Sequence, residues 1–209
     1  MRVYNTIIFD VDGTLINTET AVLHSLQKML KADYDRDVAA EDLTFVLGVP
    51  GTTSLPQLGI KDIGAANERW NYFMKEFYST IDVFAGIREL LETLQSKGIK
   101  QGIVTSKTLE ELRDDFTPFG LMPYLPYVVC ADDTEKHKPN PEPLLHFMKV
   151  SGVDPARSIY IGDTIYDYEC ARDAGVDFGL ALWGCKDHEQ IPAQYKLKSP
   201  LDLLNLVIA

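Results

Sequence analysis

Short, continuously apolar runs alternate along much of the chain with segments whose apolar residues recur at helical spacing. The first run, residues 6–9, ends abruptly at Asp10 and Asp12. A run that is apolar at every position is typical of a strand buried on both faces of a parallel sheet. Similar runs occupy residues 102–105, 127–130, 158–161 and 178–182. The pattern therefore predicts five buried strands.

Helical patterns separate these runs. Ile87, Leu90, Leu91 and Leu94 share one face of a predicted helix, and Gly98 follows where that helix should end. Residues 109–116, 143–150 and 167–174 are further helical candidates. Strands that alternate with helices predict a doubly wound, mainly parallel α/β sheet, that is, a Rossmann-like core.

The alternation breaks between residues 16 and 80, where helical periodicity continues and no convincing strand occurs. Two apolar stripes run through this segment: Val22, Leu23, Leu26, Met29 and Leu30, and then Trp70, Phe73, Met74 and Phe77. We predict a helical insert over residues 16–80 in a core formed by residues 1–15 and 81–209. The alternative is that these helices pack on the sheet like the others.

Composition narrows the function classes. The chain has 209 residues, of which 45% are hydrophobic, which suits one core domain with a smaller insert. Its net charge of −11 argues against a nucleic-acid partner, because phosphate backbones repel an acidic surface. The negative charge does not exclude a small phosphorylated substrate, because a divalent metal and one lysine can make the electrostatic potential of the binding site positive.

The expected environment is the cytoplasm. The first apolar run is too short to span a membrane and does not resemble an export signal, so we expect no membrane partner. The three cysteines, Cys130, Cys170 and Cys185, are odd in number and far apart, which predicts thiols and no disulfide framework. Composition leaves a monomer and a homodimer both open.

Polar side chains follow the predicted strands at the edge where open α/β sheets bind ligands. They are Asp10 and Asp12 after the first strand, Thr105, Ser106 and Lys107 after the second, Lys138 in the loop after the third, and Asp163 and Asp167 after the fourth. Several carboxylates in one cleft call for a cation, and oxygen ligands without a His or Cys cluster favour Mg²⁺. A metal with a nearby lysine and hydroxyl suits a phosphoryl group.

Each of these residues also has a purely structural interpretation. Asp12 and Gly13 suit a tight turn, Thr105 and Asp163 suit helix caps, and Lys138 suits a solvated loop. Their shared position at strand ends is what favours a common site.

Four motifs in order resemble the haloacid dehalogenase-like superfamily, and the resemblance covers nearly the whole chain. They are FDVDGTL at residues 9–15, IVTSK at 103–107, KPNP at 138–141 and GDTIYD at 162–167. The resemblance implies an enzyme, a phosphoric monoester or anhydride hydrolase. It points further to the phosphoglycolate phosphatase-like and pyrophosphatase-like branch with a small helical cap, here the insert over residues 16–80.

The resemblance also implies residue roles. Asp10 is expected to attack phosphorus and form an aspartyl phosphate, with Asp12 as general acid and then general base. Asp10 and Asp163 are expected to bind Mg²⁺ through side chains, Asp12 through its backbone carbonyl, and Asp167 through water or by orienting the site.

Substrate binding is expected to involve the second and third motifs. Thr105 and Lys138 would bind the transferring phosphoryl oxygens, and Lys138 would offset charge during catalysis. Gly13 would let the backbone approach the phosphate, and Ser106 lies beside Thr105. The cap loop over residues 45–51 would reach toward the leaving group, although it also reads as a plain turn between helices.

Other functions stay open at this point. A dehalogenase needs no general acid, so Asp12 and the acidic fourth motif argue against one. A sugar phosphomutase would use the same Asp10 and Mg²⁺ but form an isomer without releasing phosphate. An inactive binding or regulatory module would have lost motif residues, and none is lost.

Overall fold

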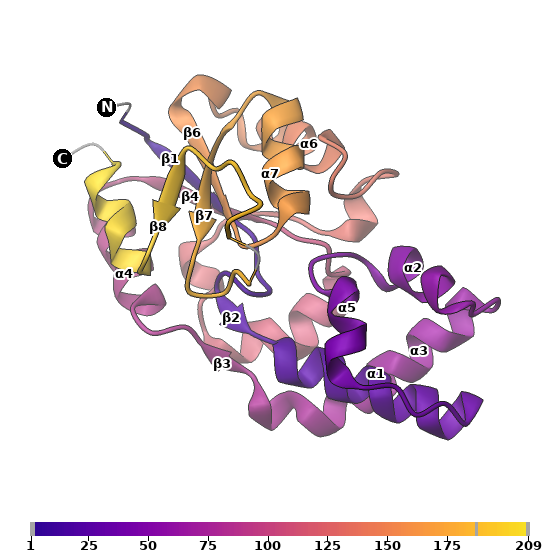
Figure 1. The fold of residues 1–209 in the computed structure, drawn as a ribbon. Coiled ribbons are helices and arrows are strands. Elements are labelled where there is room, and N and C mark those ends of the chain that lie inside the picture. Colours follow the sequence, from indigo (N-terminus) through magenta and orange to yellow (C-terminus); the bar gives the residue numbers. More distant parts are fainter. Residues whose placement is uncertain (1–2, 187, 208–209) are drawn as a thin grey trace.

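The computed structural model describes residues 3–186 and 188–207 and contains one six-stranded parallel sheet (Figure 1). Its strand order is β5-β4-β1-β6-β7-β8, and every neighbouring pair is parallel. The strands are β1 Thr6–Phe9, β4 Lys100–Val104, β5 Tyr127–Val129, β6 Ser158–Gly162, β7 Asp177–Ala181 and β8 Tyr195–Leu197. The five predicted strands are confirmed. β8 was not predicted, because a three-residue edge strand with a central Lys196 gives no apolar run.

Helices cover both faces of the sheet. On one face lie α4 Ile87–Ser96 and the 3-10 helix Pro200–Asn205, and on the other lie α6 Glu142–Ser151 and α7 Ile165–Ala174 (Figure 1). Successive side chains of β1 alternate between the two: Ile7 and Phe9 pack in the cluster with α4, and Ile8 packs in the cluster with α6 and α7. This confirms the doubly wound α/β prediction and explains why the strands are apolar at every position.

The order in which the chain adds strands to the sheet reverses at β1. From β1 the chain moves outward to β4 and β5, and it then returns to β6 on the other side of β1. Phe9 is in register with Ile103 of β4 and Ile161 of β6, so the residues that follow these strands emerge at one edge. Such a switch point is where open α/β sheets bind ligands.

A helical segment follows β1 and forms a core of its own beside the sheet (Figure 1). It contains α1 Glu19–Tyr34, α2 Gly51–Ser54 and α3 Ile63–Met74, with 3-10 helices over Ala40–Val46, Leu55–Leu58 and Lys75–Thr80. Leu26 and Leu30 of α1 pack with Trp70 and Phe73 of α3 in this core. The Asp62 side chain accepts a hydrogen bond from Ala65 N and so starts α3. We call residues 19–80 the helical cap.

One prediction about this segment was wrong. A strand pair, β2 Ile16–Asn17 and β3 Asp82–Val83, joins the two ends of the helical cap in antiparallel register. Two residues are too few to give a strand periodicity, so the sequence pattern missed β2. The predicted boundaries at 15/16 and 80/81 stay a prediction, and the core ranges include residues 1, 2, 187, 208 and 209, which lie outside the described residues.

The remaining elements are short. The predicted helix over residues 109–116 begins as α5 Leu109–Glu111 and continues as a π-helical turn, Leu112–Phe116. Further 3-10 turns are Thr117–Phe119, Met122–Tyr124, Ala131–Asp133 and Pro155–Arg157. Cys130 and Cys170 are buried thiols. In the described ranges, no helix has the length and apolarity that crossing a membrane requires.

Candidate active site

Asp10 lies directly beyond β1, at the switch point of the sheet. Its backbone N–H donates to Ile161 O at 2.8 Å, which ties it to the neighbouring strand, and its side chain is buried. The Lys138 ammonium lies 2.9 Å from Asp10 Oδ1 and 2.7 Å from Asp167 Oδ1. Lys138 is itself buried, so one cation compensates two carboxylates away from water.

Asp167, in the first turn of α7, fixes this lysine. Its Oδ1 also faces the Tyr160 hydroxyl at 2.9 Å, and that hydroxyl lies 2.9 Å from Val104 O and 3.2 Å from Lys138 Nζ. Its Oδ2 accepts hydrogen bonds from Thr164 N at 3.0 Å and from the Thr164 hydroxyl at 2.6 Å. Because both oxygens are engaged, Asp167 positions Lys138 against Asp10.

Asp163 approaches the backbone of the first motif at Gly13. A Cβ added to Gly13 would lie 2.1 Å from Asp163 Oδ2, and Gly13 has a φ of +71°. Both the left-handed conformation and this close approach require glycine here. The Thr14 hydroxyl donates to Asp163 Oδ1 at 3.3 Å. Residues 13 and 14 together therefore fix the position of this carboxylate.

Burial and mutual repulsion dominate the electrostatics of these carboxyls. Burial, with the nearby charges of Asp167 and Asp12, raises the pKa of Asp10 to about 7, although Lys138 opposes the shift. Burial and then the charges of Asp167 and Asp10 hold the pKa of Asp163 well above its ordinary value. The site therefore holds more negative charge than Lys138 offsets.

Asp10, Asp163 and Asp167 can hold a metal ion. Each offers a carboxylate oxygen, and these three atoms lie within 4.8 Å of one another. Burial first and then repulsion raise the pKa of Asp10 and Asp163, and a divalent cation would offset both by favouring the charged carboxylates. An all-oxygen donor set suits a hard cation such as Mg²⁺.

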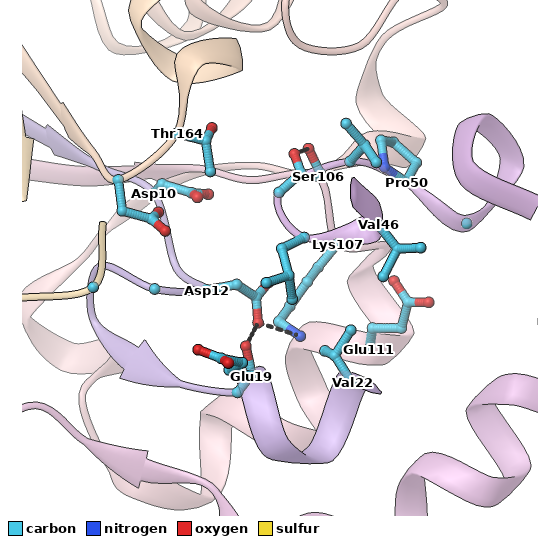
Figure 2. Close-up of a pocket in the computed structure, with 18 of the residues that line it drawn as sticks. Asp10, Asp12, Glu19, Val22, Val46, Pro50, Ser106, Lys107, Glu111 and Thr164 are labelled. Atoms are coloured by element: carbon cyan, nitrogen blue, oxygen red, sulfur yellow. Dashed lines mark hydrogen bonds and ion pairs between the residues drawn. The ribbon is translucent and has the colours of Figure 1, made fainter. Parts of the chain in front are cut away.

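Asp12 occupies the open side of the site (Figure 2). Its Oδ1 accepts a hydrogen bond from the Thr18 hydroxyl at 2.7 Å and lies 3.0 Å from Lys107 Nζ. Lys107 is also 2.6 Å from Asp115 Oδ2. Burial works against the charge on Lys107, but Asp12 and Asp115 outweigh it and raise its pKa. Burial likewise raises the pKa of Asp115 to about 6, against the attraction of Lys107.

The pocket above Asp10 lies between the sheet edge and the helical cap. Its volume is about 1030 Å³, and predicted site residues at its base are Asp10, Asp12, Gly13, Ser106 and Asp163. Thr105, Lys138 and Asp167 are buried and do not line it. The structure thus brings the charged motif residues together in two layers, with Lys138 and Asp167 beneath Asp10.

Thr105 and Ser106 make contacts of other kinds than those predicted. The Thr105 hydroxyl oxygen accepts from Lys107 N at 3.2 Å. The Ser106 hydroxyl donates to Gly48 O at 3.2 Å, which links the end of β4 to the cap loop. Phosphoryl binding by Thr105 and substrate binding by Ser106 stay predictions.

Several contacts hold the helical cap over this pocket. A Cβ on Gly48 would lie 2.7 Å from Thr164 Cγ2, so the cap loop touches the start of α7. The Asn71 side chain donates to Glu111 Oε1 at 2.9 Å, and Lys75 lies 3.1 Å from Asp114. The loop over residues 45–51 therefore lines the pocket, and its contact with the leaving group stays a prediction.

Sequence reasoning missed the contributions of Tyr160, Asp115, Thr14 and Thr18. Tyr160 belongs to an apolar strand pattern and reads as a core residue, so nothing in the sequence marked its hydroxyl. Lys107 ends the second motif, but its partner Asp115 lies in a helical segment with no signal of its own. Thr14 lies within the first motif and Thr18 shortly after it, so their closeness in sequence to Asp12 was the available signal.

Comparisons of the sequence and of the fold with known proteins agree with each other. The sequence profile of the haloacid dehalogenase-like hydrolases matches residues 7–181. The chain belongs to this family. It is 32% identical over 209 residues to the pyrophosphatase PpaX of Halalkalibacterium halodurans, covering 97% of this chain and 96% of that protein. It is also 32% identical over 206 residues to the phosphoglycolate phosphatase of Aquifex aeolicus, covering 96% and 95%.

A solved structure shares the complete architecture of this haloacid dehalogenase-like hydrolase. The crystal structure of a putative phosphoglycolate phosphatase from Lactobacillus plantarum superposes with a TM-score of 0.88 at 32% identity, over 98% of this chain and 99% of that one. These relatives confirm the predicted family, its phosphoglycolate phosphatase-like branch and the prediction of a phosphate hydrolase.

Proposed function

We propose that this protein is a Mg²⁺-dependent phosphatase that hydrolyses a small phosphorylated metabolite through an aspartyl phosphate at Asp10. The observation that supports it most is the buried pair of Asp10 and Lys138 at the floor of a large pocket, with Asp163 and Asp167 beside it. A nucleophilic carboxylate, a fixed cation and an oxygen-rich metal site are what phosphoryl transfer requires.

Asp10 carries the first step. Its carboxylate attacks phosphorus while the bond to the leaving oxygen breaks, so the phosphoryl group passes to the enzyme. Lys138, held by Asp167 and Tyr160, stays in place to offset the charge on the phosphoryl oxygens. Thr105 at the end of β4 is expected to contribute its hydroxyl to the same oxygens.

Asp12 carries the proton transfers. Thr18 and Lys107 both hold its Oδ1, while in the described part of the chain no hydrogen bond reaches its Oδ2. That oxygen is available to protonate the leaving group and then to take a proton from the water that hydrolyses the aspartyl phosphate.

Asp10, Asp163 and the backbone carbonyl of Asp12 would hold Mg²⁺, with Asp167 supporting them from its hydrogen-bonded position. When bound, the ion supplies positive charge that offsets the carboxylates and the phosphoryl oxygens. The raised pKa of Asp10 is the structural reason to expect this dependence, because a protonated Asp10 is no nucleophile.

The test is release of inorganic phosphate from a panel of pyrophosphate, phosphoglycolate, sugar phosphates and nucleotides, with Mg²⁺ and with excess chelator. We expect metal-dependent release from at least one compound. Release that continues in chelator would contradict the metal role, and absence of release from every compound would contradict the phosphatase. Conversion of one sugar phosphate to its isomer without release would indicate a phosphomutase instead.

A further inference from the structure

The pocket is much larger than a phosphoryl group requires. Ligand pockets in proteins commonly have volumes of roughly 300–1,000 Å³, and this one has about 1030 Å³. The catalytic carboxylates occupy only its base. The remaining space, between the helical cap and the sheet edge, is therefore available to the leaving group.

Much of the wall around that space is apolar or aromatic. Val22, Val46 and Pro50 of the helical cap line it (Figure 2). Half-buried rings of Tyr78 and Trp183 contribute from the cap and the core. Such walls favour a leaving group with apolar surface, because burying that surface is favourable and needs no hydrogen bonds.

Every lysine that lines the pocket already has a carboxylate partner. Lys107 lies 2.6 Å from Asp115, Lys75 lies 3.1 Å from Asp114, and Lys186 pairs with Glu19. Among the described lining residues there is no arginine. A second anionic group on a substrate would therefore have to break one of these ion pairs to find a cation.

Two further carboxylates line the pocket without a cation. Across residues 3–186 and 188–207, no lysine or arginine lies within ion-pair distance of Glu68 or Glu110. Glu111 is held by hydrogen bonds from Asn71 and from Thr108 N. Away from the metal site, the pocket therefore repels negative charge.

We infer that the substrate is a phosphate monoester whose leaving group is uncharged and partly apolar. This inference rests on the proposed phosphatase function. Relatives of this chain are named for pyrophosphate and phosphoglycolate, in which the leaving portion carries negative charge of its own. The paired lysines and the uncompensated glutamates of this pocket disfavour that class of substrate.

The test compares phenyl phosphate with 4-carboxyphenyl phosphate, measuring phosphate release with Mg²⁺. The two esters have nearly the same shape and differ by one negative charge at the far end of the leaving group. The carboxylate does not make the phenol a poorer leaving group, so a preference for phenyl phosphate reports on the pocket. We expect kcat/KM to be at least about fivefold higher for phenyl phosphate, as one like charge several ångströms away implies.

A variant with two fewer negative charges tests whether these glutamates cause the preference for phenyl phosphate. Glu68→Gln combined with Glu110→Gln should reduce that ratio by about twofold or more. Glu89→Gln is the matched control, because Glu89 lies exposed on α4 and does not line the pocket, and its ratio should equal that of the wild type.

The outcomes separate the two claims. Equal turnover of the two esters, or faster turnover of the carboxylated one, overturns the substrate class and leaves the phosphatase standing. A ratio that the double variant does not change overturns the assignment of the preference to these glutamates. Absence of phosphate release from both esters and from every compound of the panel above overturns the proposed function, and the substrate inference with it.

Discussion

Asp10→Asn should stabilise the metal-free protein while it abolishes turnover. The amide has nearly the shape of the carboxylate, so the fold around it needs little adjustment. It removes the charge that burial, Asp167 and Asp12 disfavour, and it removes the nucleophile at the same time. The residue on which the proposed chemistry depends is therefore expected to lower the stability of the fold.

The size of the effect follows from the pKa of Asp10. Its rise from 3.8 to about 7 corresponds to about 4 kcal/mol of unfolding free energy. Because the folded-state pKa lies above the unfolded one, the wild type has this stability below about pH 4 and loses it as the pH rises to about 7. The attraction of Lys138 is already included in that net shift. Asn does not titrate, so the variant should not show this loss.

The assay is thermal and urea unfolding in chelator at pH 5 and pH 8. At pH 8 Asp10→Asn should raise the melting temperature by roughly 8–16 °C, given about 2–4 °C per kcal/mol for a chain of this size. At pH 5, which lies between the two pKa values, the difference should fall to roughly 1.5 kcal/mol, or about 3–6 °C. Asp42→Asn, the same change at an exposed aspartate, should alter stability by less than about 0.5 kcal/mol.

Two results would refute this reasoning. An Asp10→Asn protein as stable as the wild type at pH 8, or less stable, would mean that burial and repulsion do not dominate at this residue. Retained phosphate release by the purified variant would rule out Asp10 as the nucleophile.

Two further substitutions test the geometry around Asp10. Gly13→Ala places a methyl group against the carboxylate of Asp163 and should lower kcat/KM at least about 100-fold in steady-state kinetics; Gly120→Ala, at a similar positive φ but in open space, should leave kcat/KM near that of the wild type. Lys107→Met leaves Asp115 buried without its cation and should lower the urea-unfolding free energy by about 3–5 kcal/mol at pH 8. The loss should be smaller at pH 5, where a protonated carboxyl needs no partner, and an equal loss at both pH values would contradict that account.

Three of the four motif positions were predictable from the sequence because each lies at the end of an element with a strong local pattern. Continuous apolar runs end at Asp10, Thr105 and Asp163. Because the strands are parallel, their carboxyl ends lie at the same edge of the sheet. Lys138 was predicted from its motif, and the structure places it 2.9 Å from Asp10. The helical cap was predictable from two stripes at helical spacing, although β2 and β3 were too short to leave a pattern.

The contacts that tune the site were decided by tertiary structure alone. Tyr160 reads as one more apolar strand residue until α7 brings Asp167 to its hydroxyl. Lys107 meets Asp12 only because β4 lies beside β1, and the cap loop meets Thr164 only because the helical cap packs near the start of α7. Local patterns record which face of an element is buried. The sequence pattern does not record which polar atoms from distant segments share a desolvated space, because that depends on how the packed elements are finally arranged.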